Sequence, residues 1–179
     1  MGVAADCTYT QQYGSQTNAT QQILNNWNSA SALYRNTFRI SLGIVELQIM
    51  DSNCPTATDP AVPWNTDCGS VTLSDRLSLF SQWRGAKGAD GTGLWHLLSR
   101  CTTGSEVGIA WLATLCVPSC MSHVTIQPIY RYRCQVTAAG TSPNVVSGTG
   151  VSTAGRTEWQ IVAHEIGHNF GAIVSHHSH

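Results

Sequence analysis

Residues 162–172 read VAHEIGHNFGA and contain the spacing HExxH at residues 164–168. Two histidines four residues apart lie one above the other on a helix, so the imidazoles of His164 and His168 can reach one zinc ion. Glu165 follows the first histidine, where its carboxylate can take a proton from a zinc-bound water molecule. The stretch therefore predicts a helix with a zinc site, in which His164 and His168 are ligands and Glu165 is the catalytic residue.

The residues around this motif have the pattern of a helix that packs on a sheet. Residues 157–160 have the form of a capping box and Gly171 is suited to end a helix, so we expect a helix from about Thr157 to Asn169. Apolar residues recur on the side opposite the histidines and would press against the sheet: Trp159, Val162, Ile166 and Phe170. The alternative is a chance match on a surface helix with ordinary histidines, which this context disfavours.

The remaining chain alternates apolar strand patterns with helical ones. The predicted strands are residues 1–5, 40–50, 94–98 and 107–115. The predicted helices are residues 20–38, with Thr20 as N-cap, and a second helix capped by Ser74. The predicted loops are residues 51–70, 85–93 and 136–155. The uninterrupted apolar run 40–50 predicts a central strand covered on both faces, and the whole alternation predicts an α/β fold with a mixed sheet in one domain.

Composition narrows the class of protein. Charged residues make up 11% of the chain and the net charge is -1, which leaves no basic surface for nucleic acid or anionic membranes. Hydrophobic residues make up 42%, which excludes an intrinsically disordered chain. No apolar run has the length of a transmembrane helix, and residues 1–6 lack the features of a signal peptide. We therefore expect a folded domain without a membrane segment or a nucleic-acid partner.

Seven cysteines are scattered along the chain, which is typical of an oxidising compartment: Cys7, Cys54, Cys68, Cys101, Cys116, Cys120 and Cys134. None forms a CxxC pair, which argues against a zinc ribbon or a thioredoxin-type site. Two of them fall in the loop 51–70, so we expect a disulfide to pin this loop. Because the number is odd, at least one cysteine has no partner within the chain, and the sequence leaves the pairing undetermined.

The motif HExxHxxG, completed by Gly171, is similar to that of the metzincin zinc peptidases, whose full motif is HExxHxxGxxH. The string at residues 162–172 closely resembles the adamalysin (reprolysin or ADAM-type) branch, especially the fungal ADAM-like proteases. Further segments are similar to strands and helices of this family, namely residues 2–7, 40–50, 75–85 and 108–112. The resemblance covers residues 2–172 and implies a metzincin upper subdomain, in which a twisted mixed sheet packs with helices and the active-site helix lies near the C-terminus.

The resemblance also implies a function. It implies a zinc-dependent endopeptidase that cleaves peptides or proteins, with Glu165 assisting the attack of zinc-bound water. In this family an edge strand pairs with an extended substrate, and its counterpart here comprises Gly108, Ile109, Ala110 and Trp111. A precursor with a signal peptide and a prodomain is implied as well, in a secreted or cell-surface protein. Cys116 matches a family cysteine that usually pairs beyond the Met-turn, so it is the expected unpaired cysteine.

The family pattern breaks at the third metal ligand, because position 174 is Val174 and valine cannot bind zinc. Either a tail histidine replaces it, the candidates being His176, His177 and His179, or residues 174–179 are a disordered and silent tail outside the family pattern. The Met-turn and the lower subdomain have no counterpart in the sequence either. We therefore expect a catalytic domain over residues 1–173, truncated just after its zinc helix. Two alternatives to an active protease stay open: an inactive truncated product with an incomplete zinc site, and a secreted non-enzymatic binding module.

Other candidate ligands are weaker. His96 lies in an apolar strand and is expected to be a hydrogen-bonded structural histidine, while His123 lies in a cysteine-bearing loop. The carboxylates Asp6, Glu46 and Asp51 are candidates for a calcium site, but calcium needs six or more oxygen ligands and these residues also suit strand ends and turns. One zinc ion is therefore the expected cofactor, and calcium is not expected.

Overall fold

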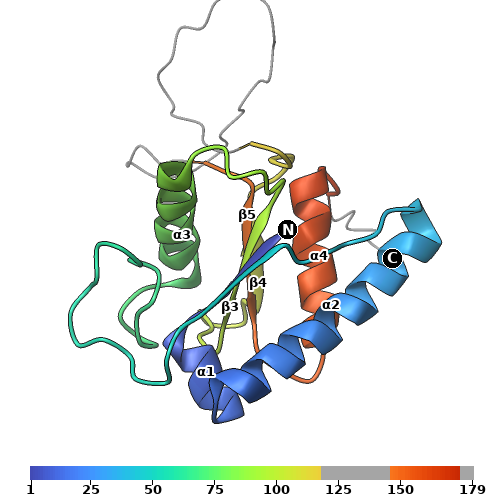
Figure 1. Ribbon diagram of the computed structural model, residues 1–179. Helices are drawn as coiled ribbons and strands as arrows, with labels where there is room; N and C mark the ends of the chain where they lie inside the picture. Colours follow the sequence, from blue (N-terminus) through green and yellow to red (C-terminus); the bar gives the residue numbers. More distant parts are fainter. Residues whose placement is uncertain (118–145, 174–179) are drawn as a thin grey trace, which may run out of the picture.

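The computed structural model describes residues 1–117 and 146–173. In this part of the chain, five strands form one mixed sheet that is flanked by four helices (Figure 1). The strands are β1 (Gly2–Ala5), β2 (Glu46–Ile49), β3 (Trp95–Ser99), β4 (Gly108–Ala110) and β5 (Thr149–Thr153). The helices are α1 (Cys7–Tyr13), α2 (Gln16–Phe38), α3 (Leu73–Lys87) and α4 (Glu158–Phe170). The predicted α/β fold with a mixed sheet, and with the motif helix late in the chain, is confirmed.

The sheet has the order β2-β1-β3-β5-β4, in which β4 is antiparallel to β5 and all other neighbours are parallel. Helices α2 and α4 cover one face of the sheet and α3 covers the other (Figure 1). Strand β1 illustrates this division, because Val3 and Ala5 pack with α2 and α4 whereas Ala4 packs with α3. All residues of β1, β3 and β5 are buried, so the core lies along the three central strands.

The predicted central strand at residues 40–50 is wrong in length and position. Only β2 is a strand, and it lies at the edge of the sheet with β1 as its single neighbour. Its residues are half-buried rather than covered on both faces. Leu47 and Ile49 of β2, and Leu42 and Ile44 before it, pack against the cluster under α2 and α4. The apolar run is therefore long because a non-strand segment also covers this cluster.

The segment 136–155, predicted as a loop, contains the central strand β5; residues 136–145 lie outside the described part. All five residues of β5 are buried although most are Thr, Ser or Gly. Their hydroxyls find partners inside the protein, since Thr149 Oγ1 lies 2.6 Å from Ser81 Oγ and Ser152 Oγ lies 2.9 Å from His96 Nε2. A strand of this composition is stable in the core because its polar groups are satisfied there.

The predicted strand 107–115 is shortened to β4. Beyond β4 the chain turns, with a positive φ of 56° at Ala113. The backbone N–H of Ala113 donates to His168 O, and that of Leu115 donates to Asn169 O. These bonds satisfy carbonyls at the C-terminal end of α4, so the segment after β4 contributes to the helix end rather than to the sheet.

Two helices begin earlier than the sequence predicts. Ser15 caps α2 with its side-chain oxygen, whereas Thr20, the predicted cap, lies inside the helix. Thr72 rather than Ser74 caps α3, and Asp75 returns the hydrogen bond in a capping box. Helix α3 also extends into the segment predicted as a turn. In both cases a hydroxyl residue slightly upstream of the predicted cap satisfies the first N–H groups.

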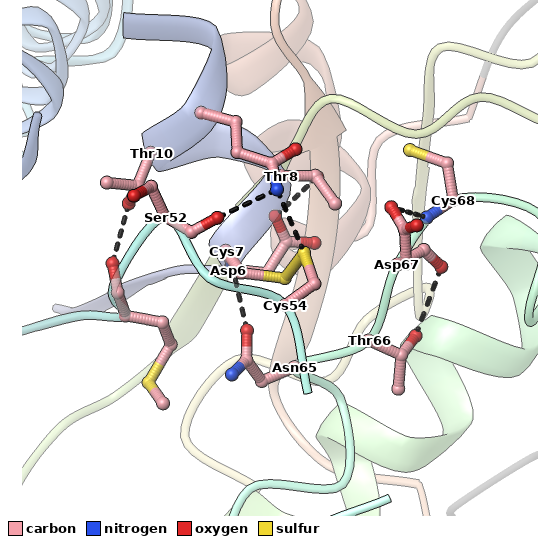
Figure 2. Close-up of a disulfide and its surroundings, with 12 residues drawn as sticks. Asp6, Cys7, Thr8, Thr10, Ser52, Cys54, Asn65, Thr66, Asp67 and Cys68 are labelled. Atoms are coloured by element: carbon pink, nitrogen blue, oxygen red, sulfur yellow. Dashed lines mark hydrogen bonds between the residues drawn. A yellow bond between two sulfur atoms is a disulfide. The ribbon is translucent and has the colours of Figure 1, made fainter. Parts of the chain in front are cut away.

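Two disulfides pin the loop 51–70, as predicted. Cys7–Cys54 joins the loop to the start of α1, and Cys68–Cys101 joins it to the chain beyond β3. Figure 2 shows the first disulfide beside a hydrogen bond in which Cys7 N donates to Asn65 Oδ1 at 2.8 Å. The loop is therefore attached beyond the C-terminal ends of the parallel strands β1 and β3.

Cys116, the cysteine expected to be unpaired, has no partner among the described residues. Its side chain is exposed. Cys120, Cys134 and His123 lie outside the described residues, so the expectations about them stay predictions.

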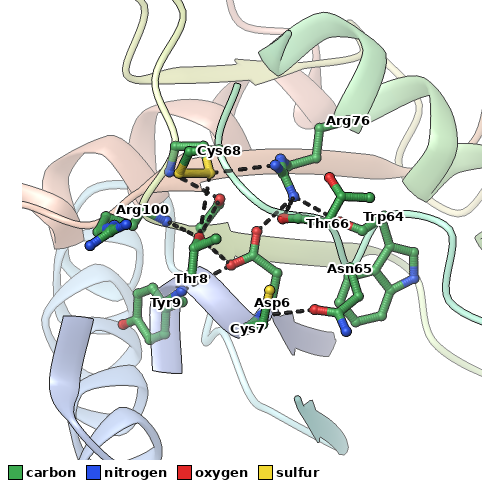
Figure 3. A network of polar contacts seen from close by, with 12 residues as sticks. Asp6, Cys7, Thr8, Tyr9, Trp64, Asn65, Thr66, Cys68, Arg76 and Arg100 are labelled. Carbon is green, nitrogen blue, oxygen red and sulfur yellow. Dashed lines mark hydrogen bonds and ion pairs between the residues drawn. A yellow bond between two sulfur atoms is a disulfide. The ribbon is translucent and has the colours of Figure 1, made fainter. Parts of the chain in front are cut away.

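A buried ion pair lies where β1 passes into α1 (Figure 3). Asp6 Oδ2 accepts a hydrogen bond from Arg76 Nη1 at 2.9 Å, and neither side chain is exposed. The other carboxylate oxygen caps α1 by accepting from Tyr9 N at 2.9 Å. Arg76 also donates to backbone carbonyls of the loop 51–70, namely those of Trp64, Thr66 and Asp67. The pair thereby connects β1, α1, α3 and the loop.

His96 is fully buried in β3, as expected for a structural histidine. Its Nε2 lies 2.9 Å from Ser152 Oγ, and its Nδ1 has no hydrogen-bond partner among the described residues. The ring packs edge-on against Trp27, with the ring centroids 5.7 Å apart. Burial lowers the pKa of His96 to about 3, so the imidazole is neutral in the folded protein at neutral pH.

We expect His96 to make the protein less stable in acid. An unfolded histidine titrates near pH 6.5, whereas the buried imidazole stays neutral to about pH 3, so protons stabilise the unfolded state as the pH falls below 6.5. The loss from this group amounts to about 2 kcal/mol at pH 5. The variant His96→Gln has no imidazole to titrate and should not show this loss. The difference in unfolding free energy, variant minus wild type, should therefore rise by about 2 kcal/mol as the pH falls from 7 to 5, as measured by urea titrations. The same pH dependence in both proteins would contradict the burial of a neutral imidazole.

Candidate metal centre

Helix α4 carries the motif and extends over residues 158–170, one residue later at each end than predicted. Gly171 ends it with a φ of 101°, and the N–H groups of Gly171 and Ala172 donate to carbonyls of the last turn. The predicted capping box is wrong, because the side chain of Thr157 makes no capping hydrogen bond. A different residue secures the start of the helix.

That residue is Glu158, the first residue of α4. Its carboxylate is buried and accepts hydrogen bonds from Tyr9 Oη at 2.5 Å, Tyr13 Oη at 2.6 Å and Asn26 Nδ2 at 2.5 Å. Burial raises the pKa of Glu158, and the three donors oppose that shift. This role does not follow from the local sequence, which offers only the general signal that an acidic residue is favourable in the first turn of a helix. The contact ties the start of α4 to α1 and α2.

The predicted apolar stripe divides into two parts. Val162 and Ile166 are fully buried against the sheet, as predicted. Trp159 and Phe170 instead face α2 and line a groove of about 640 Å³, to which Tyr34 also contributes. Phe170 is 38% exposed, so this end of the stripe does not enter the core.

His164 and His168 lie together on the open side of α4. Their Nε2 atoms are 3.0 Å apart and their rings are nearly perpendicular, at 86°. His168 Nδ1 lies 2.7 Å from Ala172 O, and since a carbonyl only accepts, we assign the His168 proton to Nδ1. The Nε2 of His168 then accepts a hydrogen bond from Nε2 of His164, and a metal ion that displaces this proton can bind both nitrogens.

This geometry fits a zinc ion. Two nitrogens bound to one tetrahedral zinc lie about 3.3 Å apart, close to the separation observed here. Burial and the neighbouring His168 lower the pKa of His164, which favours the neutral imidazole that metal binding requires. The two predicted ligands are therefore brought together in a form that can share one metal.

Glu165 lies on the inner side of the helix, next to β4. Its side chain is 5% exposed, and its Oε2 has no hydrogen-bond partner among the described residues. Burial raises the pKa of Glu165 to about 7. A carboxyl group with such a pKa can both accept and donate a proton near neutral pH, which suits a general base and acid.

A third ligand is not visible in the part of the chain that the structure describes. Within residues 1–117 and 146–173, no group of three or more His, Cys, Asp or Glu side chains could hold a metal. Val174 and the candidate substitutes His176, His177 and His179 lie outside these ranges, so the possibility of a replacement ligand stays a prediction.

The carboxylates considered for calcium are engaged elsewhere. Asp6 pairs with Arg76, and Glu46 pairs with Lys87 at 3.0 Å. Asp51 accepts a hydrogen bond from Gln16 Nε2 at 3.0 Å. Each carboxylate therefore has its own partner, and the three do not share one site.

Strand β4 forms an edge of the sheet beside α4, and its outer side is open as far as residues 1–117 and 146–173 are concerned. Val107 O accepts from Thr153 N, and Trp111 N donates to Thr149 O, so these residues face β5. In an antiparallel pair the backbone groups of alternate residues point to opposite sides, so those of Gly108 and Ala110 point to the open edge. They are available to pair with an extended peptide, although Trp111, included in the predicted edge strand, lies just beyond β4.

Asn169 joins the end of α4 to this edge. It is fully buried, and its Nδ2 donates to Trp111 O at 2.9 Å, Thr149 O at 2.9 Å and Thr114 Oγ1 at 3.1 Å. The residue directly after the second histidine thus fixes the helix relative to β5 and to the chain that leaves β4. Its position beside the motif was the only sequence signal for this role.

Comparison with known proteins places the chain among peptidases. The family model described as Metallo-peptidase family M12 matches residues 1–177. The chain is 40% identical over 179 residues to the Disintegrin and metalloproteinase domain-containing protein B of Arthroderma otae, covering 97% of this chain and 21% of that protein. The protein of the same name from Aspergillus fumigatus is 40% identical over 174 residues, covering 97% and 20%. The chain thus spans about a fifth of the length of these relatives.

More distant similarities extend this picture. The Zinc metalloprotease mde10 of Schizosaccharomyces pombe is 23% identical over 191 residues, covering 97% of this chain and 33% of that protein. Among solved structures, one described as a chaperone-substrate complex has a TM-score of 0.59 at 12% identity and covers 96% of this chain and 22% of that one. Metalloproteinase-II from Bacteroides fragilis has a TM-score of 0.50 at 15% identity, covering 96% and 41%. At these identities the two structures support the fold alone.

Asn169 should contribute strongly to stability. We expect Asn169→Ala to lower the free energy of unfolding by about 1–3 kcal/mol, because the carbonyls of Trp111 and Thr149 each lose one of their two donors and the hydrogen bond to Thr114 Oγ1 is lost as well. Asn28→Ala is a matched control, since Asn28 is an exposed asparagine of a helix and its loss should change stability by less than about 0.5 kcal/mol. Urea unfolding of both variants measures the difference, and equal effects would show that the buried hydrogen bonds do not fix the helix end.

Proposed function

The chain belongs to metallopeptidase family M12, and we propose that it acts as a zinc-dependent endopeptidase in which His164 and His168 bind the metal and Glu165 is the catalytic residue. The observation that carries this proposal is the pair of imidazole nitrogens 3.0 Å apart, with a buried carboxyl group on the adjacent residue. Metallopeptidase family membership implies a metal, and the ligand type and spacing favour zinc.

The proposed mechanism assigns separate roles to the two histidines, to Glu165 and to the backbone carbonyl of Ala172. A zinc ion at these histidines would polarise the substrate carbonyl and the attacking water as a Lewis acid. Glu165 takes a proton from that water and later donates it to the leaving amine, a double role that suits its pKa of about 7. Ala172 O accepts from His168 Nδ1 and holds the imidazole in the tautomer that presents Nε2.

The open edge of β4 supports a peptide or protein as the substrate. An extended peptide can add to this edge as a further strand by bonding to the backbone groups of Gly108 and Ala110. Glu165 packs directly against Gly108, so a peptide on the edge would have its backbone next to the catalytic carboxyl group. Binding and chemistry would then use the same strand.

An incomplete metal site is the second candidate, and a specific observation favours it. The described residues supply only two ligands, and position 174 of the sequence is valine where the resembled motif has its third histidine. A catalytic zinc ordinarily has three protein ligands. If no tail histidine substitutes, the domain of residues 1–173 is a scaffold that binds peptides at its edge without cleaving them, whether as an inactive product or as a binding module.

The setting of the protein is also part of the proposal. Two disulfides, Cys7–Cys54 and Cys68–Cys101, support an oxidising compartment such as the secretory pathway or cell surface. No helix in residues 1–117 or 146–173 is long and apolar enough to cross a bilayer. A prodomain in the precursor is proposed from the family resemblance, since the relatives are about five times as long as this chain.

Metal analysis tests the site. We expect one zinc per chain, and we expect His164→Ala or His168→Ala to weaken zinc binding at least about tenfold because each removes a ligand. Glu165→Gln should keep the zinc but reduce chelator-sensitive peptide cleavage by about 100-fold or more. His96→Gln, which alters a buried histidine away from the site, is the matched control and should bind zinc normally.

The tail histidines are tested in the same assay. If His176→Ala or His177→Ala weakens zinc binding as strongly as the two motif variants, the tail supplies the third ligand. A chain that binds no zinc would refute the proposed protease and leave the non-enzymatic scaffold.

The edge strand is tested by removing single backbone donors. Ala110→Pro eliminates an N–H that points to the open edge, so it should weaken binding of an extended peptide about 3- to 10-fold while the fold persists. The measurement uses the Glu165→Gln background, in which bound peptide is not cleaved. Ile109→Pro is the control, because its N–H faces β5 and its loss should destabilise the sheet. Unchanged peptide affinity in Ala110→Pro would argue against strand addition at β4.

A further inference from the structure

The carboxyl group of Glu165 is held by packing. It is 5% exposed, and Oε2 has no hydrogen-bond partner among the described residues. By contrast, the buried Glu158 on the same helix is fixed by three donors. The position of the Glu165 side chain therefore depends on the shape of the surface against which it lies.

That surface is the first residue of β4, Gly108. A Cβ atom added to Gly108 would overlap Glu165 Oε1 and would lie 2.8 Å from Glu165 Cδ and 2.8 Å from Ile161 Cγ2. All three atoms belong to side chains of α4. The helix can pack this closely on the edge strand, with the carboxyl group turned toward it, only because the strand has no side chain at this point.

The backbone gives no other reason for this glycine. Gly108 does not have a positive φ, unlike six other glycines of the described chain, so an L-residue fits its conformation. Glycine in a strand is unfavourable, since it loses more conformational entropy on folding and contributes no packing. The requirement at position 108 is therefore for space, and the atoms that occupy the space are those of Glu165 and Ile161.

We infer that Gly108 is a positioning residue for Glu165: its missing side chain admits the carboxyl group to the edge of β4, beside the backbone that would pair with substrate. The effect of Gly108 on catalysis rests on the proposed function, whereas the packing of Glu165 against Gly108 does not depend on it. A side chain at position 108 would turn the carboxyl group away from the edge. Because that group is the end of a flexible side chain, the fold would persist while the catalytic group moved.

The contact is tested by a double-variant cycle on thermal unfolding. Gly108→Ala should lower the melting temperature by about 2–4 °C in the wild-type background, and by less than about half as much in the Glu165→Ala background, where the clash with the carboxyl group is gone and only the contact with Ile161 remains. Gly43→Ala is the matched control, since an added Cβ there meets nothing within 4 Å and should cause the same small change in both backgrounds. An equal loss in both backgrounds would overturn the inference. So would a loss that Ile161→Ala relieves and Glu165→Ala does not, because Gly108 would then make space for Ile161.

The catalytic meaning is tested by steady-state kinetics of the full chain. Gly108→Ala should reduce kcat at least about tenfold, with KM changed less than about threefold and zinc content unchanged. A raised KM with unchanged kcat would overturn the inference, since Gly108 would then act on substrate binding. If the wild-type chain has no peptidase activity, the proposed function fails, and the unfolding cycle still decides whether Gly108 positions the Glu165 side chain.

Discussion

The buried ion pair of Asp6 and Arg76 is the contact from which the position of the motif helix follows. Two charges buried in the core are stable because they pair with each other and with further hydrogen-bonding groups, and the loss of one partner of such a pair costs about 3–5 kcal/mol. The second carboxylate oxygen of Asp6 caps α1, so the direction of α1 depends on the pair. Helix α1 in turn presents Tyr9 and Tyr13 to Glu158, where α4 begins. The ion pair is thus linked to the start of the motif helix by two sets of hydrogen bonds, those that cap α1 and those from α1 to Glu158.

The other end of α4 is fixed independently of the ion pair. Asn169 bonds to the backbone of β5 and of the chain that leaves β4, and the carbonyls of His168 and Asn169 accept from that same chain. Since both ends are held, the turn that bears His164 has little freedom to rotate about the helix axis. The helix that bears the two imidazoles and the Glu165 carboxyl group is therefore held in place at both ends by the fold.

What the sequence could predict depends on how local the decisive contacts are. Helix α4 was placed to within one residue because HExxHxxG, the apolar residues and the terminal glycine all act within a few turns. Glu158 and Asn169 were missed because their roles depend on distant partners; Tyr9 lies 149 residues from Glu158. The sequence predicts a loop at strand β5 for the same reason, since its hydroxyls find distant partners in Ser81, His96 and the backbone of Val107. Local periodicity carries no information about such pairings.

This arrangement separates folding from metal binding. In a zinc finger the metal supplies the folding energy, because the chain has too small a core. Here the sheet is packed on both faces and two disulfides hold the loop 51–70, so the described scaffold has stabilising contacts of its own apart from the metal site. A preoriented histidine pair lowers the entropic cost of binding zinc, yet it does not replace a missing ligand. Whether residues 174–179 supply a third metal ligand therefore distinguishes the proposed peptidase from the alternative peptide-binding scaffold. The fold and the edge of β4 are common to both proposals.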